Sequence, residues 1–257
     1  MAGLGCNPWM GDFLHLLCVT YFSGGIFFFL LYFIVPQSFE TRGLVVHGKT
    51  FTGKPDWTRV PKRLFSLFYI AGIIFCSLGI ITVTGKSLPK WMLLLHLFRR
   101  LIESTLMPYS KDSKMHIIHS IVGLSYYLIL SLCFNLSEWG EFADLKRSSL
   151  LVAIFVLLNL LQLLVHLGLH RARSMGQYQA IGDQSKIFEY VLCPHYLMEI
   201  GIHSVFLVLS NFIHLLLLNL LFVALNLTIS ARQTLQWYKM QFPKRKKYPK
   251  AIIPFLL

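Results

Sequence analysis

The sequence predicts an all-α membrane protein of about seven transmembrane helices, with the N-terminus lumenal and the C-terminus cytosolic. Of its 257 residues, 55% are hydrophobic and only 14% are charged, whereas an ordinary soluble domain carries roughly a quarter charged residues. The apolar residues gather into runs of about 20, the length that a helix needs to cross the hydrocarbon layer. Lys and Arg lie mainly between these runs.

Seven apolar segments, bounded by charged residues, Pro and Gly, predict the helices in order. They span residues 12–35, 65–84, 91–107, 116–136, 149–169, 190–209 and 212–230. Backbone polar groups inside lipid need internal hydrogen bonds, which a run of this length supplies as a helix. The third segment contains Arg99 and Arg100, and the last two run together through Ser210 and Asn211. Seven helices leave no room for a separate soluble domain, so residues 1–257 are expected to form one transmembrane domain.

The distribution of positive charge predicts the orientation. The first segment lacks the basic start of a signal peptide, so it is expected to remain as a span. With the N-terminus lumenal, 20 of the 24 Lys and Arg fall at the cytosolic ends and loops, and the positive-inside rule then fixes the topology. The alternative is six spans with a re-entrant third segment. It would place the basic loop 36–64 and the basic tail on opposite sides of the membrane.

Several classes of site find no support in the sequence. The five cysteines are scattered without a CxxC pair, so we interpret them as small buried hydrophobes and expect no metal. No GxGxxG loop is present, and a dinucleotide site here is therefore not of the Rossmann type. The basic, aromatic tail after Trp237 is too short for a nucleic-acid surface and suits anionic lipid headgroups. No obligate protein partner is inferred.

Polar side chains inside apolar segments are the first candidates for function, because they are expensive in lipid. Glu103 follows Arg99 at the i, i+4 spacing and Arg100 at i, i+3, so these side chains meet on one helix face. This cluster is either an internal ion pair near the membrane surface or part of a functional site.

Two further groups of polar residues lie at predicted helix ends. Pro194 suits the first turn of a helix, which places His195, Tyr196 and Glu199 on its opening turns, with His195 and Glu199 on one face. We expect a hydrogen-bonded pair or a polar ligand site there, since no second pair completes a metal site.

The other group follows the fifth segment. His166 and His170 are one helical turn apart, and Arg171 and Arg173 come directly after them. The histidines either meet the membrane interface or belong to a site whose arginines suit phosphate.

Three motifs resemble one enzyme family. The segments FEYVLCPHYLMEI (188–200) and YPKAIIPFLL (248–257) resemble the C-terminal signature of the steroid 5α-reductase family, and LHLFRRLIES (95–104) resembles its third helix. The branch that the chain is most similar to is that of the polyprenol (polyprenal) reductases. The resemblance is specific from about residue 91 to residue 257.

The resemblance implies a fold and an activity. Members of the family are seven-helix, multi-pass enzymes of the endoplasmic reticulum membrane. They use NADPH, bound from the cytosolic side, to reduce a carbon–carbon double bond conjugated to a carbonyl. The polyprenol branch saturates the α-isoprene unit on the way to dolichol, the lipid carrier of protein N-glycosylation. The implied partners are a polyprenoid lipid substrate and membrane lipids.

The resemblance also implies roles for individual residues. Glu103 and Tyr196 correspond to positions near the reacting centre and are the expected catalytic residues. Seven further positions correspond to cofactor contacts: Arg100, Arg171, Arg173, Tyr178, His195, Glu199 and Tyr238. Among these, His195 and Glu199 fall where the family holds the nicotinamide end, and Tyr238 falls near the adenosine side.

The chemistry agrees with these residue types. Hydride delivery to the β-carbon builds negative charge on the carbonyl oxygen, so the site needs a proton source there and dry walls. A Tyr or a protonated Glu is a suitable donor, and Arg suits the phosphates of NADPH.

Three alternatives stay open. A 3-oxo-5α-steroid 4-dehydrogenase and a very-long-chain enoyl-CoA reductase share the fold, but steroid-reducing members carry an acidic residue on the second helix, and segment 65–84 has none. Leu235 stands where polyprenol-type members commonly have His, which leaves a catalytically inactive membrane scaffold as the third alternative.

Overall fold

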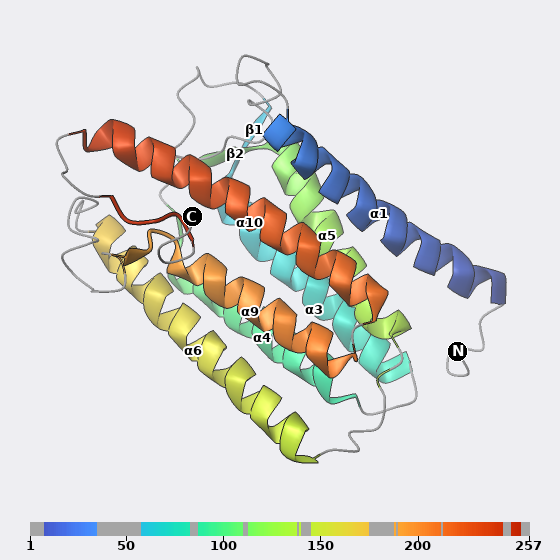
Figure 1. The fold of residues 1–257 in the computed structure, drawn as a ribbon. Helices are drawn as coiled ribbons and strands as arrows, with labels where there is room; N and C mark the ends of the chain where they lie inside the picture. Colours follow the sequence, from blue (N-terminus) through green and yellow to red (C-terminus); the bar gives the residue numbers. More distant parts are fainter. Residues whose placement is uncertain are drawn as a thin grey trace.

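The computed structural model describes residues 8–34, 58–82, 87–109, 113–137, 139, 145–174, 188, 190–211, 213–243 and 248–252. Within these ranges, seven long helices form one bundle (Figure 1). The helices are α1 (Pro8–Ile34), α3 (Phe65–Thr82), α4 (Leu88–Leu106), α5 (Ile117–Leu136), α6 (Leu145–Ser174), α9 (Pro194–Leu209) and α10 (His214–Gln241). Each of the seven apolar segments predicted from the sequence lies largely within one of them.

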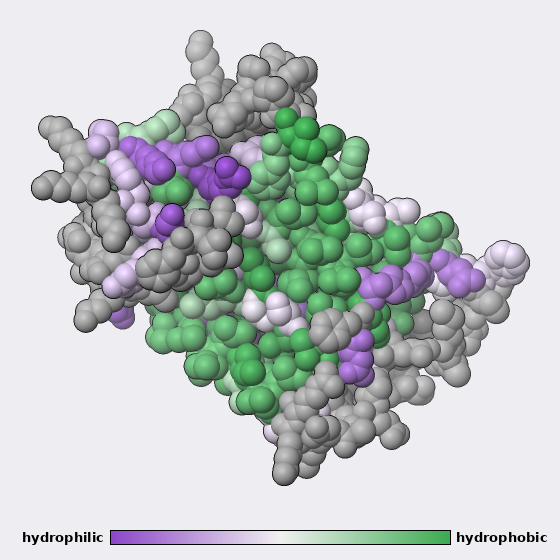
Figure 2. Space-filling model, viewed as in Figure 1, coloured by the Kyte–Doolittle hydropathy of each residue, from purple (hydrophilic) through white to green (hydrophobic). Residues whose placement is uncertain are grey.

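In the part of the chain that the structure describes, five helices are long and apolar enough to cross a membrane. These candidate spans are Trp9–Ile34, Lys62–Thr82, Ile117–Leu136, Ser148–Ser174 and His214–Gln241. The helix α9 is apolar but has only 16 residues, and α4 carries Lys90, Arg99, Arg100 and Glu103. Figure 2 shows hydrophobic side chains over the middle of the visible face and hydrophilic ones toward its ends. The chain is therefore a multi-pass, all-α membrane protein.

The helix ends differ from the prediction at the last two segments. The sixth segment was expected from residue 190, but α9 begins at Pro194, because residues 190–193 pair with the tail instead. The seventh was expected to end at residue 230, whereas α10 continues to Gln241. Its last turns are polar, so they lie outside the apolar pattern, yet no helix-breaking residue occurs before Pro243.

Two apolar clusters hold the bundle together. One lies among α3, α4, α5, α6 and α9 and includes Leu93, Phe134 and Phe206. The other joins α1 to α5 and α10 through Phe22 and Phe222. The four described cysteines are buried, which confirms their interpretation as small buried hydrophobes for these positions; the fifth, Cys6, lies outside the described residues.

Two short pairings outside the helices were not expected. The strands β1 (Arg59–Pro61) and β2 (Lys114–His116) form an antiparallel ladder beside the start of α3, which follows the 3-10 turn η2 (Lys62–Leu64). In the second pairing, the backbone of Lys250 donates to the Tyr190 carbonyl at 2.9 Å and accepts from the Leu192 N–H at 2.8 Å. This bridge fixes the tail against the segment that enters α9.

Candidate active site

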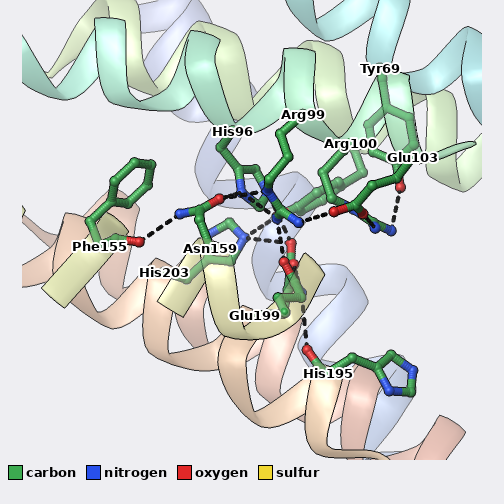
Figure 3. A network of polar contacts seen from close by, with 12 residues as sticks. Tyr69, His96, Arg99, Arg100, Glu103, Phe155, Asn159, His195, Glu199 and His203 are labelled. Atoms are coloured by element: carbon green, nitrogen blue, oxygen red, sulfur yellow. Dashed lines mark hydrogen bonds and ion pairs between the residues drawn. The ribbon is translucent and has the colours of Figure 1, made fainter. Parts of the chain in front are cut away.

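The polar residues of α4 form one face of that helix. His96, Arg99, Arg100 and Glu103 recur every three or four residues, so their side chains point the same way. That face meets α3, α6 and α9 in the interior of the bundle (Figure 3). His96 and Glu103 are almost completely buried. Charged groups at such a position need partners, and the neighbouring helices supply them.

Glu103 is the anionic centre of the cluster. Its carboxylate accepts hydrogen bonds from both Arg99 and Arg100, which confirms the ion pairs predicted from their spacing. The Nδ1 atom of His166, on α6, lies 2.8 Å from Glu103 Oε2. The same nitrogen lies 2.9 Å from Arg100 Nη1. The carboxylate thus accepts from two guanidinium groups and lies beside one imidazole.

Amide side chains of α6 complete the shell around Arg99. Its Nε donates to Asn159 Oδ1 at 2.9 Å, and its Nη2 donates to Gln162 Oε1. Asn159 is itself held by a hydrogen bond from its Nδ2 to the Phe155 carbonyl, at 2.8 Å. Both amides are buried, so they serve as fixed dipoles rather than as a solvated surface.

Glu199, on α9, is the second anion of the network. Gln162 Nε2 donates to its Oε2, and His96 Nε2 lies 3.3 Å from its Oε1. Gln162 Nε2 also donates to the His195 carbonyl at 3.0 Å. With the histidines neutral, the carboxylates of Glu103 and Glu199 balance the charges of Arg99 and Arg100, which makes the buried cluster neutral as a whole.

A cavity opens on one side of this cluster. It lies between α3, α4 and α6, and its polar wall is formed by Tyr69, Arg100, Glu103, Ser104 and His166. The Arg100 Nη2 donates to the Tyr69 hydroxyl at 2.9 Å, and the guanidinium carbon lies 5.3 Å from the centre of the Tyr69 ring. The hydroxyl is therefore held at the wall of the cavity by a permanent cation.

The remaining lining of the cavity is apolar and basic. Phe65 and Met107 are its apolar members. Tyr109 lies between two cations, with Arg173 5.1 Å and Lys62 5.2 Å from its ring centre. Phe65 begins α3, Met107 and Tyr109 follow the end of α4, and Arg173 lies near the end of α6, so the cavity lies at that end of the bundle.

Four of the expected site residues come together in this region. Arg100, Glu103 and Arg173 line the cavity, and Glu199 belongs to the ion network beside it. His195 and Glu199 were expected on one face of the helix as a hydrogen-bonded pair or a polar ligand site. Figure 3 shows the His195 ring pointing away from Glu199, whose carboxylate is bound by side chains of α4 and α6.

His195 instead faces two aromatic rings. Its ring centre lies 4.2 Å from that of Tyr196 and 5.3 Å from that of His166. Its Nδ1 is buried and has no hydrogen-bond partner among the described residues. Tyr196 is half-buried and lies beside His195, which in turn lies beside His166 at the cavity wall.

The other expected residues lie elsewhere. Arg171 is exposed. Tyr238 is buried near the end of α10, with its ring centre 4.7 Å from that of Phe242. Leu235 packs in the same apolar cluster as Tyr238. Tyr178 lies outside the described residues.

Sequence reasoning missed several members of the network. Tyr69, His96, Asn159 and Gln162 are single polar residues in apolar runs, and only their contacts with other helices reveal them. One signal was available: Asn159, Gln162 and His166 recur at spacings of three and four, which marks a polar face on α6. Within the described residues no group of three or more His, Cys, Asp and Glu is arranged to hold a metal ion.

Comparison with known proteins gives one consistent group. Residues 106–257 match the family described as 3-oxo-5-alpha-steroid 4-dehydrogenase. The polyprenal reductase of Saccharomyces cerevisiae is 32% identical, over 77% of this chain and 75% of the yeast protein. Polyprenal reductase 1 of Arabidopsis thaliana is 27% identical, over 84% of this chain and 86% of its own. The polyprenal reductase of Homo sapiens is 26% identical, over 87% of this chain and 88% of the human protein.

Proposed function

The chain belongs to the 3-oxo-5-alpha-steroid 4-dehydrogenase family, and from this premise we propose that it is an NADPH-dependent oxidoreductase that saturates the α-isoprene double bond of polyprenal. The reaction is a step of dolichol synthesis for protein N-glycosylation. The observation that carries the proposal is the 32% identity to a polyprenal reductase over 77% of the chain. An aldehyde substrate also fits the chemistry, because its carbonyl oxygen accepts the charge that develops when a hydride reaches the β-carbon.

The cavity suits one part of the cofactor. Arg173 and Lys62 stand at its rim around the Tyr109 ring, and Arg side chains bind phosphate well. The buried, unpartnered Nδ1 of His195 is a group that a nicotinamide carboxamide would satisfy. NADPH supplies the hydride when it is bound. We therefore propose Arg100, Arg173, His195 and Glu199 as residues that hold it, while Arg171, Tyr178 and Tyr238 stay sequence-based predictions.

Tyr69 is our candidate for the proton donor. Glu103 accepts from two arginines, so we assign it the role of anchoring Arg100 rather than of giving up a proton. The Tyr69 hydroxyl accepts from Arg100 and lines the cavity, so we propose that it gives its proton to a substrate bound there. A cation on the phenol oxygen stabilises the charge left behind when that proton is given to the substrate. Tyr196 is the alternative donor that the family resemblance implies.

The topology is part of the same proposal. We infer seven spans, an N-terminus in the lumen and a C-terminus in the cytosol, within the endoplasmic reticulum membrane. The cavity lies at the end of the bundle where α4 and α6 finish, and the sequence assigns these ends to the basic, cytosolic side. That side is where soluble NADPH is available. The apolar helix surfaces give a polyprenoid chain access from the bilayer.

The decisive experiment is an assay of the purified, full-length protein in detergent with NADPH and polyprenal. We expect a product heavier by two hydrogens, with the aldehyde retained. Testosterone and a very-long-chain enoyl-CoA serve as competing substrates, and preference for either would overturn the branch assignment. Absence of NADPH binding in a fluorescence titration would instead favour a membrane scaffold that has lost the chemistry.

Two matched substitutions test the donor. Tyr69→Phe should lower kcat about a hundredfold, the lower end of what general acid catalysis contributes, while Tyr196→Phe keeps most of the activity. The opposite ranking would assign the proton to Tyr196.

A further inference from the structure

A second group of buried polar side chains lies next to Glu199, on the side away from the cavity. It consists of His203 on α9, Asn219 on α10 and Tyr126 on α5. His203 and Asn219 are 3% and 1% exposed, in a region otherwise filled by the apolar clusters. Polar groups buried in a membrane bundle are expensive unless paired, and nothing in the proposed reaction uses these three directly.

Their hydrogen bonds form a chain. The Tyr126 hydroxyl lies 3.1 Å from Asn219 Oδ1, and Asn219 Nδ2 lies 2.9 Å from His203 Nδ1. The other ring nitrogen of the histidine, Nε2, lies 3.8 Å from Glu199 Oε1 and 3.5 Å from the Tyr126 hydroxyl. The chain therefore ends on a carboxylate that we assign to the cofactor site.

The hydrogen bonds from Tyr126 through Asn219 to His203 can point in either of two directions, and the Glu199 carboxylate favours one of them. In the first, Tyr126 donates to Asn219, the Asn219 amide donates to Nδ1, and the ring proton is on Nε2. In the second, the Asn219 amide is turned over, Nδ1 carries the proton, and Nε2 presents a lone pair to Glu199. A lone pair facing an anion in a low-dielectric interior is unfavourable, whereas an N–H facing it is attractive.

We propose that Tyr126, Asn219 and His203 are positioning residues that hold the His203 ring with its Nε2–H directed at Glu199. Glu199 then has two donors, Gln162 from α6 and His203 from its own helix, beside the His96 ring of α4. This fixes the carboxylate in one place and keeps it ionised for the cofactor. The role of Glu199 in holding the cofactor rests on the function proposed above, but the ring tautomer of His203 does not.

The tautomer has a direct spectroscopic test. Protein labelled with 15N in its histidine rings should show one signal pair with a protonated Nε2 and an unprotonated Nδ1 that disappears in His203→Gln. A protonated Nδ1 at His203 would overturn the inference, whatever the protein does with NADPH.

The positioning role is tested by NADPH titration and steady-state kinetics. His203→Leu removes the N–H and should weaken NADPH binding about tenfold, the effect of one lost contact to a charged group, with the KM for polyprenal unchanged. His203→Gln keeps an N–H that reaches toward Glu199 and should stay within about threefold of wild type, since only shape is altered. Tyr21→Phe is the control, because it removes a hydroxyl bound to Ser125 and Val122 and leaves Tyr126, Asn219 and His203 in place.

The outcomes separate the two proposals. Equal loss of NADPH affinity in His203→Gln and His203→Leu would indicate a role in stability alone and overturn the positioning role. Wild-type NADPH affinity in His203→Leu would overturn it as well. A wild-type protein that binds no NADPH would overturn the proposed function, and the cofactor role of the three residues with it.

Discussion

At the scale of single residues, the buried charges of the site differ in how many other charged groups depend on them. Glu103 is bound by Arg99, Arg100 and His166 at once, whereas Arg99 also has the Asn159 and Gln162 amides. Removing the anion leaves two guanidinium groups without their main counter-charge. Removing Arg99 leaves Glu103 with two of its three partners.

This asymmetry predicts unequal losses of stability. Glu103→Leu should destabilise the folded protein by about 3–5 kcal/mol, the usual result of leaving buried charges uncompensated. Arg99→Met, which also removes one buried charge, should cost clearly less. The measurement is the thermal midpoint of the purified protein in detergent, without ligand. Equal midpoints for the two variants would contradict the assignment of Glu103 as the central anion.

The two arginines that end α6 also differ. Arg173 lies at the rim of the cavity over Tyr109, while Arg171 is exposed. Arg173→Ala should raise the KM for NADPH about tenfold, as expected for a lost arginine–phosphate contact. Arg171→Ala is the matched control and should change it little. A larger effect at Arg171 would place the phosphates on the outer surface of α6.

How much of the site follows from the sequence depends on the distance between partners along the chain. The pairs of Glu103 with Arg99 and Arg100 are local, so their spacing alone predicts them. The contact of Arg100 with Tyr69 joins α4 to α3, and that of Glu199 with His96 joins α9 to α4. No periodicity within one helix indicates which other helix its polar face meets.

At the scale of elements, the entry to α9 depends on the tail. Lys250 donates to the Tyr190 carbonyl, while Leu192 and Cys193 donate to the carbonyls of Lys250 and Ala251, and these bonds are the described backbone pairing between the two segments. They fix the direction in which α9 begins, and Glu199 is only two turns further along. The tail therefore contributes to the site without lining the cavity.

A proline in the tail tests this connection. Lys250→Pro removes the N–H that donates to the Tyr190 carbonyl and leaves that carbonyl without its partner, a loss of about 1–3 kcal/mol. We expect a lower thermal midpoint and weaker NADPH binding, with Lys250→Ala near wild type on both measures. If Lys250→Ala were as damaging as Lys250→Pro, the lysine side chain would be the important group.

The helices themselves were the most predictable part of the structure, because apolar length is a strong signal in lipid. Their ends were less so. The polar final turns of α10 carry no apolar pattern, and the pairing of residues 190–193 with the tail depends on residues about 60 positions away in the chain. The strands β1 and β2 are likewise too short to produce a recognisable alternation.

At the scale of the whole molecule, the one-sided positive charge and the position of the cavity agree. The ends of α4 and α6 and the start of α3 surround the cavity, and the predicted cytosolic loops join these same ends. A cofactor that enters from the cytosol therefore meets the basic side of the protein first, which favours binding of a polyanion by long-range attraction.

Glycosylation mapping tests the orientation. A flexible extension with an Asn-X-Thr acceptor should be glycosylated in microsomes when it is fused to the N-terminus and should remain unmodified on the C-terminus. An acceptor placed between α5 and α6 should also be modified. Modification of the C-terminal acceptor would contradict an odd number of spans with a lumenal N-terminus.

The ion cluster of α4 also affects how the chain enters the membrane during synthesis. Each Arg at the centre of a lone helix opposes insertion by roughly 2.5–3.5 kcal/mol, and the amides that satisfy Arg99 arrive only with α6. Recruitment of α4 from the translocon into lipid must then wait for α6. Leu95→Cys, on an outward position of α4, should react with an impermeant maleimide in a nascent chain that stops before residue 145 and become protected once residue 174 has emerged.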